Sequence, residues 1–149
     1  MIFEAHEIHP ADELDWIKDP DVDEYEEREK RNFMLRDMLQ SGESVQFRSS
    51  GNSLRPKVQS GDVTMWEPVT EEGCADLKVG DIVFCRPQPK NYFYGHAIHE
   101  INQWSDGRTY WVISNLKKGS EFKINGWCLA EHIYGKLMEV SGVEARGQY

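Results

Sequence analysis

The sequence predicts a mainly β fold, either a sheet or a partly open barrel, with one N-terminal helix. Seven short segments with strand-like apolar patterns follow residue 43, and turn signals containing glycine separate most of them. Many short strands at this spacing are typical of antiparallel sheets and barrels. A single stretch of helical periodicity lies ahead of them.

The helix is predicted over 20–42. Asp19-Pro20-Asp21 is a helix-start signal, because proline suits the first turn and acids complement the helix dipole. An apolar stripe with helical spacing covers residues 33–39, and Gly42 marks the end of the helix. Strands are expected near Ser44–Arg48, Val63–Trp66, Asp81–Arg86, Tyr92–Ile101, Arg108–Ser114, Glu121–Ile124 and Ile133–Val140. The turn signals are Ser60-Gly61-Asp62, Val79-Gly80-Asp81, Ser105-Asp106-Gly107 and Asn125-Gly126.

The length of 149 residues suits one folded domain with short extensions. The expected organisation is an acidic leader over 1–19, the helix over 20–42, a β domain over 43–141 and a loose tail over 142–149. The chain carries a net charge of −9, and its first 30 residues, with twelve acids and three bases, account for all of it. That segment is either a solvated leader or an arm that docks on a basic partner surface. Direct binding of nucleic acid is not expected, because nothing offsets the phosphate charge.

Several classes of protein are excluded by what the sequence lacks. No apolar run is long enough to span a bilayer, so we expect no membrane anchor, and the acidic N-terminus is not a secretory signal. Three widely spaced cysteines without a CxxC motif argue against a disulfide framework and a thiolate zinc site, so they are expected to be buried. We therefore expect a cytoplasmic protein with no cofactor and no bound metal. His132, beside Glu131, is expected to be exposed where a strand begins.

Two short stretches carry the candidate chemistry. The first runs from Ser49 to Pro56, where Gly51 allows a tight turn and Ser53 can be displayed beside backbone N–H groups. Taken alone, such a cluster is more typical of a plain turn. The second runs from Tyr92 to Ile101 and contains His96 and His99. On a strand these two histidines point to opposite faces, so they do not form a paired metal site, although one of them can act as a general base.

The order of several motifs resembles the superfamily of signal peptidases and LexA-like repressor autoproteases. The family pattern is Ser-Gly-x-Ser-Met-x-Pro, a Gly-Asp pair, a Gly-Asp-Ile-Val block, a basic residue on a later strand and a terminal Gly-Lys-Val strand. The matching segments lie within residues 43–140 and are Ser50–Pro56, Gly61-Asp62, Gly80–Val83, His96-Ala97-Ile98 and Gly135-Lys136-Leu137.

The resemblance implies a soluble serine endopeptidase or a self-cleaving protein. Ser53 matches the nucleophile, and His96 matches the general-base histidine of the serine–histidine members. The backbone N–H of Ser53 and the side chain of Asn52 are the expected oxyanion donors. Ser114 and Asn115 occupy the place of a supporting Gly-Asp-Asn segment. A peptide or protein substrate would lie extended along a sheet edge.

The chain departs from the family pattern at three positions. Leu54 replaces a methionine, Ala97 replaces an arginine, and Ser114 replaces the aspartate that would orient the histidine. The loss of both charged residues is expected if they pair with each other in relatives. These departures leave two other functions open. One is a catalytically impaired interaction module, an inhibitor or adaptor that binds a basic surface through its acidic segment. The other is an assembly component that forms a homodimer.

Overall fold

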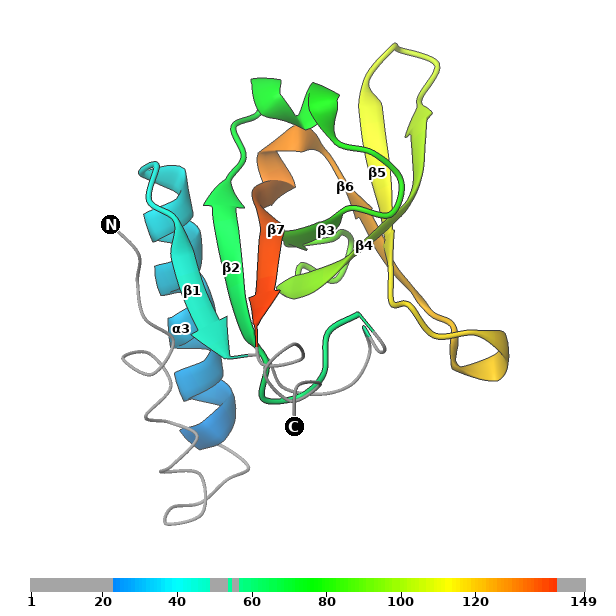
Figure 1. The fold of residues 1–149 in the computed structure, drawn as a ribbon. Coiled ribbons are helices and arrows are strands. Elements are labelled where there is room, and N and C mark those ends of the chain that lie inside the picture. The colour runs from blue at the N-terminus through cyan, green and yellow to red at the C-terminus, as the bar shows by residue number, and fades with distance from the viewer. Residues whose placement is uncertain (1–22, 49–53, 55–56, 142–149) are drawn as a thin grey trace.

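The computed structural model describes residues 23–48, 54 and 57–141, and the following account is confined to them. Within these residues one α-helix precedes a single antiparallel sheet of seven strands in the order β1-β2-β7-β3-β4-β5-β6 (Figure 1). This confirms the predicted mainly β class with one N-terminal helix. The sheet is open, with β1 and β6 at its two ends. The elements are α3 (Asp23–Gln40), β1 (Val45–Arg48), β2 (Val63–Pro68), η1 (Glu72–Asp76), β3 (Ile82–Cys85), β4 (Tyr94–Gln103), β5 (Thr109–Ser114), η2 (Gly119–Glu121), β6 (Ile124–Cys128), η3 (Ala130–His132) and β7 (Ile133–Ser141).

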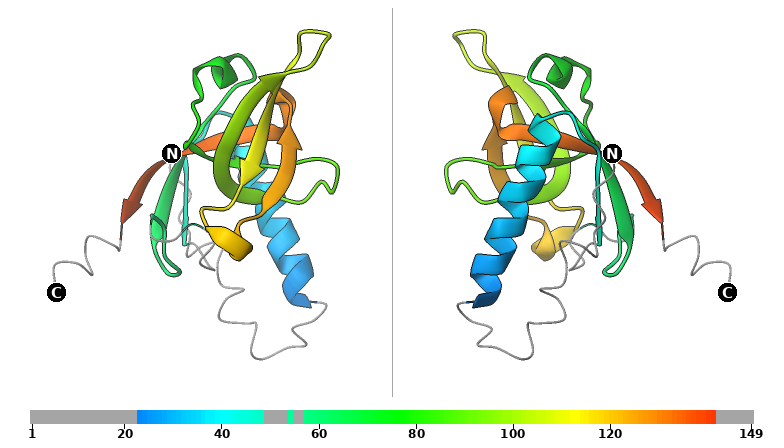
Figure 2. Two further views of the ribbon diagram at one scale, coloured as in Figure 1. Left: turned by 90° about the vertical axis from the view of Figure 1, so that its right-hand side faces the viewer. Right: turned by 90° about the vertical axis from the view of Figure 1, so that its left-hand side faces the viewer.

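The helix α3 packs its C-terminal half on the sheet. Leu35 and Leu39 lie one turn apart and are both buried against the strands. The helix ends at Gln40 and is terminated at Gly42 as predicted: the N–H of Glu43 donates to the carbonyl of Met38, and the N–H of Gly42 donates to the carbonyl of Leu39. This is the Schellman arrangement that satisfies the last carbonyl groups of a helix. In Figure 2, α3 and the curved strands β4, β5 and β6 lie on opposite sides of the molecule.

The central strand β3 separates two apolar clusters. All four of its residues are buried, which explains why its sequence is continuously apolar instead of alternating. Ile82 and Phe84 join the cluster beneath α3, which also contains Leu54 and Ala97. Val83 and Cys85 face the second cluster, which lies inside the curve of β4, β5 and β6 and includes Ile98, Trp111, Ile113 and Cys128.

The sheet curls because the chain after β3 pairs with β6. Gln88 forms a two-way backbone bridge with Trp127, with N···O distances of 2.7 and 3.1 Å. A Cβ atom on Gly126 would lie 2.2 Å from the carbonyl oxygen of Gln88, and Gly126 has a φ of 134°. Only glycine fits this position. The prediction that Asn125-Gly126 is a turn between strands is therefore wrong, because both residues lie within β6, and the strand predicted near Glu121–Ile124 begins only at Ile124.

Two turns of the same design lead into β2 and β3. In each, an aspartate Oδ2 accepts a hydrogen bond from the backbone N–H three residues earlier: Asp62 from Gln59 at 2.8 Å and Asp81 from Lys78 at 2.9 Å. The aspartate N–H donates to the carbonyl of that same residue. The glycine between them, Gly61 or Gly80, has a positive φ, as a turn with glycine in its third position requires. Both Gly-Asp pairs of the sequence are therefore closures of strand-entry turns.

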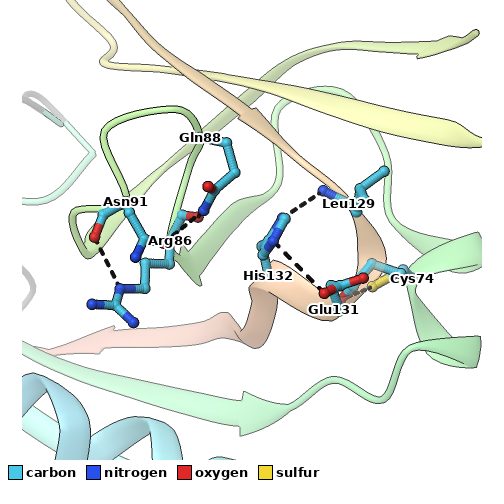
Figure 3. Close-up of polar contacts among 8 residues, drawn as sticks. Cys74, Arg86, Gln88, Asn91, Leu129, Glu131 and His132 are labelled. Atoms are coloured by element: carbon cyan, nitrogen blue, oxygen red, sulfur yellow. Dashed lines mark hydrogen bonds and ion pairs between the residues drawn. The ribbon is translucent and has the colours of Figure 1, made fainter.

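The segment around η3 is held by polar contacts that Figure 3 draws. The ring Nδ1 of His132 accepts a hydrogen bond from the N–H of Leu129 at 3.0 Å. Its side chain is 19% exposed, so the expectation of an exposed histidine is wrong. On the neighbouring turn, Arg86 Nε donates to the carbonyl of Asn91. Each of these contacts stays within its own segment, and the N–H of Arg86, which donates to the carbonyl of His132 at 2.9 Å, joins the two segments.

All three cysteines are buried and free, which confirms the expectation that they act as small core residues. No helix within the described part of the chain is long and apolar enough to cross a membrane.

Candidate active site

His96 lies near the start of β4, on the face of the sheet that lines the curl. Its cross-strand partner is Val83, which belongs to the cluster inside that curl. The ring of Tyr94, two residues earlier on the same face, packs on the imidazole with centroids 4.8 Å apart. The imidazole is therefore half-buried in an apolar setting and fixed by its neighbours.

The ring nitrogen Nδ1 of His96 lies 2.5 Å from Oδ1 of Asn125 on β6. Burial lowers the pKa of His96 below its ordinary value, and the hydrogen bond to Asn125 opposes that shift. A histidine in this setting is neutral at pH 7. A neutral imidazole is the form that accepts a proton from a nucleophile.

Asn125 is the site residue that sequence reasoning missed. The pairing of β5 with β6 matches Ile113 to Gly126 and Ser114 to Ile124, so Asn125 is the extra residue of a β-bulge. Bulges redirect side chains and are common beside functional sites. The only sequence signal here was the Asn-Gly dipeptide, and its usual meaning is a turn. The local signal therefore pointed away from the position that reaches His96.

The other histidine of β4 lies outside this arrangement. The pairing of β4 with β5 skips His99, which is the extra residue of a second bulge. Its side chain is exposed, and its ring packs on Phe122 with centroids 5.1 Å apart. This agrees with the prediction that the two histidines do not share a site.

Ser53 and Asn52 lie outside the described residues, so their predicted roles stay predictions. The residue after the predicted nucleophile, Leu54, is described and is buried in the cluster beneath α3. Its carbonyl accepts a hydrogen bond from the N–H of Val58 at 3.0 Å. Ala97, the neighbour of His96, belongs to the same cluster. Leu54 and Ala97 therefore pack in one core, on the face of β4 opposite the His96 ring.

Ser114 and Ala97 are direct cross-strand partners on β5 and β4. These two departures from the expected motif thus lie opposite each other in the sheet. Because neighbouring side chains alternate along a strand, Ser114 lies on the opposite face of the sheet from His96. Its hydroxyl donates to the carbonyl of Asn115 at 2.9 Å.

Asn115 organises its own loop. Its Nδ2 donates to the carbonyl of Glu121, and its Oδ1 accepts from the N–H groups of Lys117 and Lys123. These contacts close the segment between β5 and β6 around η2. The structure therefore gives Ser114 and Asn115 polar partners other than His96, while Asn125 contacts the His96 ring.

Cys74 and Cys85 have no nucleophilic character in this fold. Burial raises the pKa of Cys74 to about 12, with smaller contributions from Cys128 and Glu71. Burial also raises the pKa of Cys85 well above its ordinary value. Protonated, buried thiols are inert. Among the described residues, no group of three or more His, Cys, Asp or Glu side chains is placed to hold a metal ion.

Compared with models of protein families, with curated proteins and with solved structures, the chain gives no match.

Proposed function

We propose that this protein is a serine endopeptidase or a self-cleaving protein in which Ser53 is the nucleophile and His96 the general base. The observation that carries the proposal is the setting of His96: a half-buried imidazole whose Nδ1 is occupied by Asn125. An imidazole held through one nitrogen presents the other, Nε2, as a base. The motif resemblance supplies Ser53 as the nucleophile, and Leu54, the residue that follows it, is buried.

The proposed reaction passes through an acyl-enzyme. The Ser53 hydroxyl oxygen attacks a peptide carbonyl, and its proton passes to Nε2 of His96. The backbone N–H of Ser53 and the Asn52 amide stabilise the oxyanion. When the peptide bond breaks, His96 gives the proton to the leaving amine. A water molecule, deprotonated by His96, then hydrolyses the ester and restores the serine.

The substrate in this proposal is a peptide or protein segment in an extended conformation, or a segment of the chain itself. Three free, buried cysteines fit a reducing compartment such as the cytoplasm. Formation of a homodimer, one of the functions that the sequence left open, stays a prediction.

The test compares the purified full chain with Ser53→Ala and with Ser50→Ala, a control three residues earlier in the sequence. Each protein is incubated with unstructured peptides, and products and intact masses are followed by mass spectrometry. We expect cleavage by the full chain and by Ser50→Ala, and none by Ser53→Ala. Equal behaviour of the full chain and Ser53→Ala would overturn the proposal, and it is the outcome expected of a non-catalytic interaction module.

A further inference from the structure

The contact between His96 and Asn125 joins two strands that are not adjacent in the sheet. The residues are 29 positions apart, and Nδ1 and Oδ1 are separated by 2.5 Å. An amide oxygen has no hydrogen to donate, so in the neutral ring Nδ1 must carry the proton. The lone pair then lies on Nε2, which is the tautomer that a general base for a serine needs.

The position of Asn125 is built by the fold around it. Asn125 is the unpaired residue of the bulge in β6, directly before Gly126. The backbone of Gln88 crosses so close to Gly126 that no side chain fits there, and the bridge from Gln88 to Trp127 fixes this end of β6. The bulge therefore holds the amide on the side of the sheet where the His96 ring lies.

Among the described residues, the contacts of the His96 ring are apolar or aromatic apart from Asn125. Val83 on β3 and Tyr94 on β4 are among its neighbours in the described part of the chain. Burial and Asn125 are the causes of the His96 shift, with no charged group of the described residues among them. The Asn125 amide is therefore a polar group through which the fold acts on the tautomer and the proton affinity of this histidine.

We propose that Asn125 is the positioning residue of the site and fills the role that an aspartate has in serine–histidine–aspartate triads. This inference rests on the proposed function. A neutral amide oxygen fixes the tautomer as a carboxylate does, but it stabilises the protonated imidazolium less. Asn125 thus gives a base that stays neutral at a lower pH, while a carboxylate in its place gives a stronger base.

The test uses the full chain with Asn125→Ala, Asn125→Asp and a control, Asn102→Ala. Asn102 lies on β4, the strand that carries His96, and its side-chain amide donates a hydrogen bond to a carboxylate oxygen of Glu100 at 2.7 Å. The ring nitrogens of His96 are followed by NMR during a pH titration, with the signals assigned from a His96→Gln variant. In parallel, kcat and KM for peptide cleavage are measured across pH.

In the full chain and in Asn102→Ala we expect the Nδ1–H tautomer and a pKa below 6.5. Asn125→Ala should mix the tautomers, lower the pKa further and reduce kcat by about 10²-fold with little change in KM, since a positioned general base contributes about 10²- to 10⁴-fold. Asn125→Asp should keep the tautomer, raise the pKa and move the acid limb of the kcat profile to higher pH. This rescue distinguishes positioning from mere packing.

The two proposals fail in different ways. An unchanged tautomer and pKa in Asn125→Ala would overturn the role of Asn125, even if Ser53-dependent cleavage is present. An unchanged kcat for peptide cleavage in a folded Asn125→Ala protein would also overturn the role of Asn125. Absence of Ser53-dependent cleavage would overturn the proposed function and, with it, a positioning role in catalysis, while the titration would still show what holds the ring.

Discussion

Asp62→Ala and Asp81→Ala remove the same hydrogen bond from two turns of the same design, and we expect unequal losses of stability. Asp62 is fully buried, and its bond to the N–H of Gln59 is partly buried. Asp81 is 21% exposed, and its bond to the N–H of Lys78 lies at the surface. The two turn hydrogen bonds are matched in donor, acceptor and spacing, and they differ in burial.

The magnitudes follow from what replaces the carboxylate. At Asp62 water does not reach the site freely, so the Gln59 donor loses a charge-assisted bond worth about 2–3 kcal/mol. At Asp81 water takes over the Lys78 donor, and the loss is about 0.5–1 kcal/mol. The ion pair of Asp81 with Lys136, at 3.6 Å and partly exposed, adds little. The expected difference between the variants is about 1.5–2 kcal/mol.

Urea unfolding at pH 7 measures this difference. With an m-value of about 1–3 kcal/mol/M that is unchanged by either substitution, the midpoints of the two variants should differ by about 0.5–2 M. Asp62→Asn and Asp81→Asn keep an acceptor oxygen and should each lose less than the matching alanine variant. An Asp81→Ala protein that loses as much stability as Asp62→Ala would refute the reasoning that burial decides the cost.

Two further outcomes are expected. Gly126→Ala should lower the free energy of unfolding by about 3 kcal/mol or more, because strain at a positive φ adds to a clash with the backbone of Gln88. A loss below about 1 kcal/mol, measured by urea unfolding, would contradict this. Burial lowers the pKa of His132, so stability should be intact above about pH 6.5 and fall as the pH drops, because the unfolded chain takes up the proton first. His132→Asn keeps an acceptor for Leu129 and should lose less stability than the full chain between pH 7.5 and 5; equal losses would count against this explanation.

The class of the fold and most of its strands were predictable because their signals are local. Gly42 ends α3 where the periodicity stops, and Gly61 and Gly80 mark turns because few other residues adopt their backbone conformation. The separation of His96 from His99 also followed from the alternation of side chains along one strand. These features depend on residues within one or two turns of each other, and the sequence displays them directly.

The candidate site was likewise predictable only where local signals set it. His96 was a candidate from its strand and from the order of the motifs, but its contact with Asn125 joins β4 to β6. Asn-Gly is a strong local turn signal, and here the backbone of Gln88 overrides it by closing on Gly126. A bulge arises from the pairing of strands, so no local pattern revealed which residue would be redirected toward the histidine.

The amino-acid sequence thus determined the antiparallel strands, the single helix, the strand-entry turns and the histidine that the site is built around. Tertiary structure alone decided that Asn125 on β6 contacts Nδ1 of that histidine. The physical reason is that backbone preferences act over a few residues, whereas the register of β5 against β6 and the approach of Gln88 are set by packing between distant segments.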